Sequence, residues 1–173
     1  MGKAHIICGS PGAGKSTYGK RLAAKIRAAF IDIDTATERL VRLSLLESGH
    51  DMNDRDSPYF KTTYRQVIYD AMFDIAIENL PHIDVVIAGP FTREIRDPLW
   101  PGFLENHLKS TVEIHYVYCE PEIRRKRLLE RANDRDRLKF EDWDAFNRYY
   151  GQENPPDFKC VLFDNTYPFT GSK

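Results

Sequence analysis

The sequence predicts an α/β fold in which a parallel β-sheet lies between layers of helices. Short apolar runs alternate along the 173 residues with stretches of helical periodicity, and this alternation is typical of successive βαβ units. Runs such as Val85-Val86-Ile87 are continuously apolar, as in strands that are buried on both faces. The first apolar run leads into a glycine-rich loop and then a helical pattern. At this length we expect a single domain.

Five strands are expected, at residues 5–8, 30–33, 84–88, 112–119 and 158–163. Helical patterns cover residues 15–28, 35–47, 58–79, 97–107, 121–131 and 140–150. The longest, 58–79, has an apolar stripe at helical spacing that predicts a face packed on the core. Its members are Phe60, Tyr64, Val67, Ile68, Ala71, Met72 and Ile75, with a second stripe at Tyr69, Phe73 and Ile77.

Residues 9–16 read G-S-P-G-A-G-K-S, a complete G-x-x-x-x-G-K-[ST] phosphate-binding loop between a strand and a helix. Glycines let the backbone curl so that its N–H groups and the helix N-terminus converge on phosphate oxygens. Lys15 is expected to reach the β- and γ-phosphates and Ser16 to hold Mg²⁺. The motif therefore predicts binding of ATP with Mg²⁺. The expected nucleotide contacts are Gly9, Ser10, Pro11, Gly12, Ala13, Gly14, Lys15, Ser16 and Thr17.

Two carboxylates, Asp32 and Asp34, follow the second apolar run. Ligands of such sheets sit at the carboxyl ends of the strands, and alternation along a strand would point both side chains to one side. We assign Asp32 to the metal and Asp34 to the attacking hydroxyl, as the group that orients or deprotonates it. The reverse assignment is open, and Asp34 as the N-cap of the next helix is the alternative.

The third strand ends without an acidic residue, which shifts the metal role to Asp32 and Asp34. Thr92 and Arg93 follow this strand, and Arg65 lies near the start of the long helical pattern. These three residues are candidate contacts of the second substrate. The alternatives are an ordinary helix start and a solvated helix arginine.

Residues 124–139 carry the densest positive charge in the chain, and Arg127 and Arg131 are four apart on a predicted helix. Like charges at that spacing repel, unless an anion lies between them. Arginines suit the charge that spreads over a transferred phosphoryl group. We expect a short lid that closes over ATP, with catalytic Arg127 and Arg131 and with Arg135 on the nucleotide. The alternative is that these basic residues form a solvent-exposed face without a bound anion.

The last strand is followed by Asp164-Asn165-Thr166. A polar loop at this place lies beside the phosphate loop, and Asn165 is expected to contact the adenine. A plain turn is the alternative.

With these motifs in place, the chain resembles the small P-loop kinases of the nucleoside-monophosphate-kinase-like group. That group includes shikimate and gluconate kinases, chloramphenicol phosphotransferase, zeta toxins and polynucleotide 5′-kinase. Asp32-Ile33-Asp34 resembles the D-x-D of shikimate kinase, whereas only Gly89 stands where that family has three glycines. The resemblance implies a P-loop NTPase three-layer α/β/α sandwich with strand order 2-3-1-4-5, and an acceptor held over the cleft by residues 39–69.

The function predicted is an ATP-dependent kinase that phosphorylates a hydroxyl of a small molecule. One alternative is a 5′-hydroxyl polynucleotide kinase, which the basic segment supports; nucleic acid is not the favoured partner, because a net charge of −1 creates no global attraction. Another alternative is a nucleotide-binding regulatory ATPase module. No N-K-x-D or D-x-x-G motif supports a GTPase switch.

Composition is ordinary for a globular protein, with 42% hydrophobic and 29% charged residues. The three cysteines lack metal-site spacing and predict reduced thiols. No apolar run approaches the ~20 residues of a membrane span, and no leader precedes the loop. We therefore expect a cytoplasmic protein without a membrane partner; the oligomeric state stays open.

Overall fold

Five strands form one parallel sheet in the computed structural model, which describes residues 1–132, 134–136, 140, 144 and 155–167. The order is β2-β3-β1-β4-β5, and every adjacent pair is parallel. The predicted fold class and strand order are thereby confirmed. The strands are β1 (Ala4–Cys8), β2 (Ala29–Asp32), β3 (Val85–Ala88), β4 (Val112–Tyr118) and β5 (Val161–Asp164).

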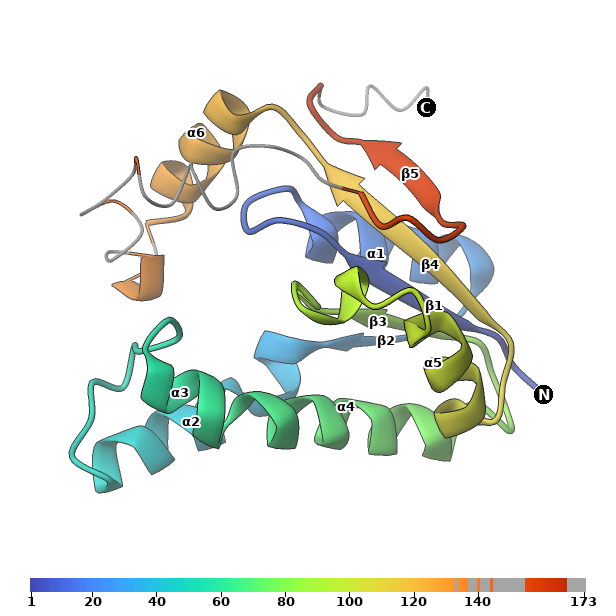
Figure 1. Cartoon of the computed structure of the whole chain (residues 1–173), viewed down its shortest axis with the longest axis horizontal. Coiled ribbons are helices and arrows are strands. Elements are labelled where there is room, and N and C mark those ends of the chain that lie inside the picture. The colour runs from blue at the N-terminus through green and yellow to red at the C-terminus, as the bar shows by residue number, and fades with distance from the viewer. Residues whose placement is uncertain (133, 137–139, 141–143, 145–154, 168–173) are drawn as a thin grey trace.

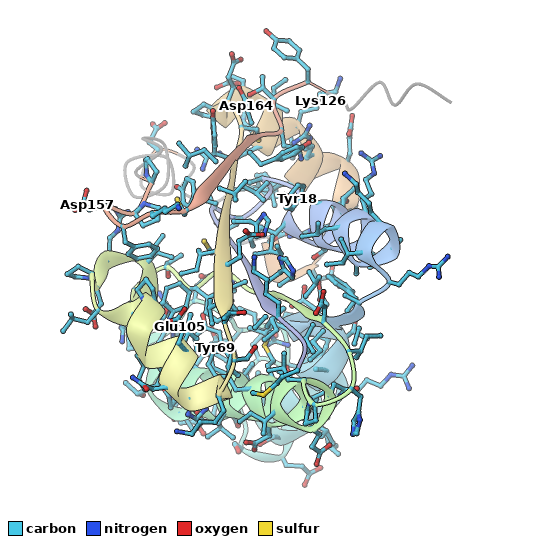
Figure 2. The ribbon with its side chains drawn as sticks, turned by 90° about the vertical axis from the view of Figure 1, so that its right-hand side faces the viewer. Tyr18, Tyr69, Glu105, Lys126, Asp157 and Asp164 are labelled. Atoms are coloured by element: carbon cyan, nitrogen blue, oxygen red, sulfur yellow. The ribbon has the colours of Figure 1, made fainter. Side chains whose placement is uncertain are left out.

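Helices cover both faces of this sheet. Figure 2 shows α1 and α5 on opposite sides of β4. Two 3₁₀ turns, Glu94–Arg96 and Asp134–Asp136, complete the elements of the described residues. The helices are α1 (Lys15–Ile26), α2 (Ile33–Glu47), α3 (Pro58–Thr63), α4 (Arg65–Asn79), α5 (Trp100–Leu108) and α6 (Pro121–Arg131). The helix predicted at 140–150 lies outside the described residues, apart from Phe140 and Asp144.

Strand β1 is buried on both faces because successive side chains of a strand point in opposite directions. Ile6 joins the larger core, to which α2, α4 and α5 contribute. Ile7 joins the smaller core under α1 with Val86 and Val117. Both isoleucines are fully buried, which explains why the run is apolar without alternation.

The helix predicted at 58–79 is two helices, with the break at Tyr64. The hydroxyl of Thr62 donates to the backbone carbonyls of Pro58 and Tyr59, and such back-bonding tends to bend helices. The two expected core stripes are wrong at three positions, because Val67 is 65%, Ile75 39% and Ile77 37% exposed. The buried residues of α4 are Ile68, Tyr69, Met72, Phe73 and Ala76.

The carboxyl ends of the strands face the side of the molecule where α6 and the α2–α3 region lie (Figure 1). The phosphate loop follows β1 at this edge, and α6 follows β4. No helix of the described residues is long and apolar enough to cross a bilayer. No disulfide joins Cys8, Cys119 and Cys160.

Candidate active site

The glycines of the phosphate loop leave its backbone accessible to a bound phosphate. Gly14 has φ +94°, and a Cβ added there would lie 2.2 Å from Nδ2 of Asn165. Helix α1 begins directly after it, with no side-chain cap on Gly14 and no acidic residue in its first turn. The first N–H groups of α1 therefore have no competing side-chain acceptor at the cap, which suits them to bind phosphate.

Lys15 is curled over this loop, where its Nζ donates to the backbone carbonyl of Ser10 at 2.9 Å. Burial lowers the pKa of Lys15 to about 8, and the positive charge of Arg131 acts in the same direction. The Asp34 carboxylate acts in the opposite direction and favours the charged form. A bound phosphate would act in the same direction as Asp34 and favour the charged form of Lys15.

Ser16 and Asp32 are in direct contact. The hydroxyl of Ser16 donates to Oδ2 of Asp32 at 2.6 Å, and Asp32 is almost completely buried. A hydroxyl and a carboxylate oxygen are hard ligands of the kind that Mg²⁺ prefers, directly or through water. These two residues therefore fit the magnesium site that the phosphate loop implies.

The expectation that Asp32 and Asp34 lie on one strand and point to the same side is wrong. Strand β2 ends at Asp32, and Asp34 lies in the first turn of α2, where strand alternation does not apply. Asp32 is also the N-cap of α2, because its Oδ1 accepts the N–H groups of Asp34 and Thr35 at 3.0 and 3.4 Å. The capping role considered for Asp34 thus belongs to Asp32, and Asp34 instead lines the pocket.

Helix α6 has the predicted bounds and packs on the phosphate loop. Arg124 is fully buried, and a Cβ added at Gly12 would lie 3.1 Å from its carbonyl oxygen. The first turns of α6 are therefore packed against the loop, and only part of the basic segment 124–139 can be a solvent-exposed face.

Arg127 and Arg131 both line the pocket. Nη2 of Arg127 donates to the carbonyl of Asn165 at 2.7 Å, whereas its Nη1 is buried and has no hydrogen-bond partner among the described residues. Arg131 forms an ion pair with Asp136, to which its Nε donates at 2.9 Å. The side chain of Arg135 lies outside the described part of the chain.

Asn165 holds the phosphate loop from outside the pocket. Its Nδ2 donates to the carbonyl of Ala13 at 2.8 Å, and its backbone N–H donates to the carbonyl of Tyr118 at 2.7 Å. Asn165 thereby links the loop, β4 and Arg127. The adenine contact expected for it stays a prediction.

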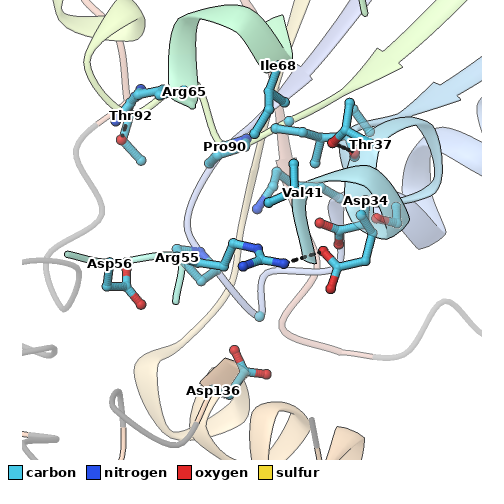
Figure 3. Close-up of a pocket in the computed structure, with 18 of the residues that line it drawn as sticks. Asp34, Thr37, Val41, Arg55, Asp56, Arg65, Ile68, Pro90, Thr92 and Asp136 are labelled. Atoms are coloured by element: carbon cyan, nitrogen blue, oxygen red, sulfur yellow. Dashed lines mark hydrogen bonds and ion pairs between the residues drawn. The ribbon is translucent and has the colours of Figure 1, made fainter. Parts of the chain in front are cut away.

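A cavity of about 510 Å³ connects the phosphate loop with α2, α3, α4 and the segment after β3. Figure 3 shows Asp34 and Thr37 on one wall and Arg65 and Thr92 on the opposite wall. Arg93 is not among the lining residues and is exposed. The predicted site residues that line the cavity are Pro11, Gly12, Gly14, Lys15, Ser16, Thr17, Asp34, Arg65, Thr92, Arg127 and Arg131.

Arg65 and Thr92 are joined to each other and to Glu94, which is not among the lining residues. Nη2 of Arg65 donates to Oγ1 of Thr92 at 3.2 Å and to Oε2 of Glu94 at 3.0 Å. The guanidinium also lies over the ring of Tyr69, 5.5 Å from its centroid. These contacts orient the side chain of Arg65 at the cavity wall.

Sequence reasoning missed two residues near Asp34 and Thr37, Arg55 and Glu38, which line the cavity and form a 3.0 Å ion pair. The Arg55 guanidinium lies 5.2 Å from the centroid of Phe60. Glu38 is four residues after Asp34 in α2, so the helical spacing could have placed it on the same face. Arg55 comes from the irregular segment 48–57, where no periodicity exists. Asp56, Lys61 and Asp136 also line the cavity.

This fold and this loop define a P-loop nucleotide-binding protein. Residues 5–153 match the family model described as an AAA domain, and the chain belongs to that family. No protein with a curated description matches the sequence.

Solved structures share the fold at low sequence identity. A protein from Chloroflexus aurantiacus with a provisional kinase assignment is 15% identical, with a TM-score of 0.66, over 99% of this chain and 92% of that one. A gluconokinase from Sinorhizobium meliloti is 14% identical, with a TM-score of 0.54, over 96% and 84%. Kti12 of Chaetomium thermophilum, solved with ADP-AlF3, is 20% identical, with a TM-score of 0.56, over 95% and 89%. The chain thus has the fold of small P-loop kinases and of Kti12.

Proposed function

We propose that this protein is an ATP-dependent phosphotransferase that moves the γ-phosphoryl group to a hydroxyl of a small molecule. The observation that carries the proposal is the extent of the cavity. It begins at the phosphate loop and continues, past Asp34, to side chains of α2, α3 and α4. An ATPase that only drives a partner needs no such compartment beyond the γ-phosphate, whereas a kinase needs one for its acceptor.

The residues of the loop and of α1 would hold the nucleotide. Lys15 neutralises the β- and γ-phosphate oxygens when it is charged. Ser16 and Asp32 would hold Mg²⁺, which supplies charge neutralisation on the phosphates and orients them.

Asp34 is the residue we assign to the acceptor. It lines the same cavity as Lys15, and its carboxylate favours the charged form of Lys15; both observations support a position near the γ-phosphate. From there its carboxylate orients the acceptor hydroxyl and takes its proton. Arg127 and Arg131 enter from α6 and stabilise the charge on the transferred group.

The acceptor end of the cavity suits a small polar molecule. Phe60 and Val41 offer apolar surface, while Arg55, Lys61 and Arg65 offer hydrogen-bond donors. A volume of about 510 Å³ is within the range of small-molecule sites. A nucleic-acid acceptor has less support, because Arg124 of the basic segment is buried and Arg127 and Arg131 line the cavity.

The test is ADP release from Mg²⁺-ATP with a panel of acceptors, and with Lys15→Ala as the blank. The panel contains sugars, sugar acids, nucleosides, amino alcohols, antibiotics and 5′-hydroxyl oligonucleotides, and ³¹P NMR identifies each phosphorylated product. We expect one class of small molecule to raise ADP release far above the basal rate, with an equal amount of phosphate monoester formed.

Slow ADP release that no acceptor changes would contradict the proposal and favour a regulatory ATPase. Phosphorylation of oligonucleotides alone would replace the small-molecule acceptor. Full activity of Lys15→Ala would contradict the nucleotide site itself.

A further inference from the structure

A second cluster of reactive side chains lies between the sheet and α1, away from the cavity described above. It consists of His5 on β1 and of Glu113 and His115 on β4. In the parallel pairing of these strands His5 is opposite Glu113, and Ile7 is opposite His115. His5 and Ile7 therefore share a face of β1, and this is the face that packs under α1.

The three ligand atoms of this cluster form a nearly equilateral triangle. Nδ1 of His5 lies 3.2 Å from Nε2 of His115, and each nitrogen lies 3.2 Å from Oε2 of Glu113. In a tetrahedral site with bonds of about 2.0 Å, neighbouring ligand atoms are about 3.3 Å apart. The triangle thus has the size of one face of a tetrahedral metal site.

Hydrogen bonding alone does not account for this triangle. If both nitrogens carry a proton toward the carboxylate, the contact between the two histidines brings two donors together. If only one nitrogen is protonated, the lone pair of the other nitrogen points at a lone pair of the carboxylate oxygen. With Glu113 ionised, one of the three contacts is repulsive in either case, whereas a central cation makes all three attractive.

The surroundings orient these side chains as metal sites require. The hydroxyl of Tyr18 lies 2.9 Å from Nδ1 of His115, and Figure 2 shows Tyr18 on the side of the sheet that α1 covers. When Nδ1 donates to this oxygen, Nε2 keeps its lone pair for a metal. Nζ of Lys3 lies 3.0 Å from the other oxygen of Glu113 and fixes that carboxylate.

The two histidines are 7% and 4% exposed, and burial lowers the pKa of both, that of His115 to about 4. Neutral imidazole is the form that binds metals. Glu113 keeps more than a third of its side chain exposed, so an ion can enter from its side.

We propose that His5, Glu113 and His115 bind one divalent ion of the zinc class, at a site separate from the nucleotide cavity. Two imidazole nitrogens and one carboxylate oxygen match Zn²⁺ and its neighbours, while Mg²⁺ and Ca²⁺ prefer oxygen ligands alone. Three protein ligands leave one position for water. The ion would join β1 to β4 under α1, whereas the phosphate loop follows the opposite end of β1.

The experiment uses the whole chain, stripped with a chelator and kept free of nucleotide. Zn²⁺ uptake is measured by equilibrium dialysis with elemental analysis, and Co²⁺ is added as a spectroscopic probe of four-coordinate geometry. We expect one ion per chain and an intense visible Co²⁺ band. Glu113→Gln and His115→Gln should lose both, and Tyr18→Phe should bind about tenfold to a hundredfold more weakly.

Two controls separate this site from others. His82→Gln removes an exposed histidine of the turn before β3 and should leave uptake unchanged. Ser16→Ala removes the hydroxyl at the expected magnesium site and should also leave Zn²⁺ uptake unchanged.

No uptake by the unmodified chain would overturn the proposal, as would equal uptake by Glu113→Gln or uptake that Ser16→Ala abolishes. Circular dichroism checks the fold of each variant. If His115→Gln does not fold, Glu113→Gln at its partly exposed position carries the test.

Discussion

The hydroxyl of Ser16 donates a 2.6 Å hydrogen bond to Oδ2 of Asp32, while Oδ1 of the same carboxylate caps helix α2. One buried side chain thus connects the helix after the phosphate loop, the end of β2 and the start of α2. The magnesium position and the position of Asp34 are coupled through this carboxylate, because Asp34 lies in the first turn that Asp32 caps.

The two roles of Asp32 can be separated by two substitutions. Asp32→Asn keeps a good N-cap and removes the charge, so we expect near-normal stability and a large loss of Mg²⁺-dependent activity. Asp32→Ala removes the cap as well and should cost about 0.5–2 kcal/mol of unfolding free energy. Urea unfolding and the Mg²⁺ dependence of ADP release measure the two effects. Equal stability of the two variants would contradict the capping role.

Asp34→Asn should reduce phosphoryl transfer by roughly 10²- to 10⁴-fold, the usual contribution of a positioned general base. ATP should still bind, because the phosphate loop is unchanged. Single-turnover transfer to an identified acceptor and calorimetric ATP binding measure the two quantities. Asp74→Asn, on the exposed side of α4, is the matched control. If Asp34→Asn has a normal rate and Asp32→Asn is inactive, the assignments of Asp32 to the metal and Asp34 to the acceptor hydroxyl are reversed.

Local signals in the sequence were sufficient for the strands and for most of the helices, whereas the strand order came from the family resemblance and the helix break at Tyr64 was missed. Continuous apolar runs such as Val85–Ala88 predict buried strands, and the start of α6 follows from Pro121 at its first position. The loop motif is likewise local, since its residues are consecutive in the chain.

The site was predictable only where its residues are close together in the sequence. Strand β2 ends one residue earlier than the apolar pattern suggests, because the Asp32 side chain caps the backbone that follows it. Because the strand is one residue shorter at this end, Asp34 lies in a helix instead of following directly on the strand. The pairing of Arg55 with Glu38 joins residues 17 positions apart, through a segment without periodicity, and no local pattern reports such a contact.

The binding of ATP should weaken at alkaline pH. The pKa of Lys15 is lowered to about 8 in the protein without nucleotide, and bound phosphates favour the charged ammonium, so ATP raises this pKa. Above pH 8 binding must take up a proton, and affinity should fall by about tenfold for each further pH unit, with little change below pH 7.5. Calorimetry at constant free Mg²⁺ from pH 7 to 9.5 measures this dependence.

The control for this profile is Lys15→Arg, because a guanidinium stays charged throughout the range. Its ATP affinity should be lower than that of the unmodified chain but flat with pH. If the ATP affinity of the unmodified chain does not change with pH, Lys15 is not the group whose protonation limits binding.

Asn165 should matter for ATP binding although it lies outside the cavity. Asn165→Ala removes the 2.8 Å hydrogen bond to the Ala13 carbonyl and keeps the backbone carbonyl that accepts from Arg127. A lost hydrogen bond of this kind costs about 1 kcal/mol, so ATP affinity should fall by up to about fivefold. Asn79→Ala is the matched control, since its Nδ2 also donates to a backbone carbonyl, that of Ile75, at the far end of α4. If both variants lose stability equally and neither loses ATP affinity, Asn165 is only a turn residue. A loss of ATP affinity confined to Asn165→Ala means that its side chain serves the nucleotide site, through the phosphate loop or through the predicted adenine contact.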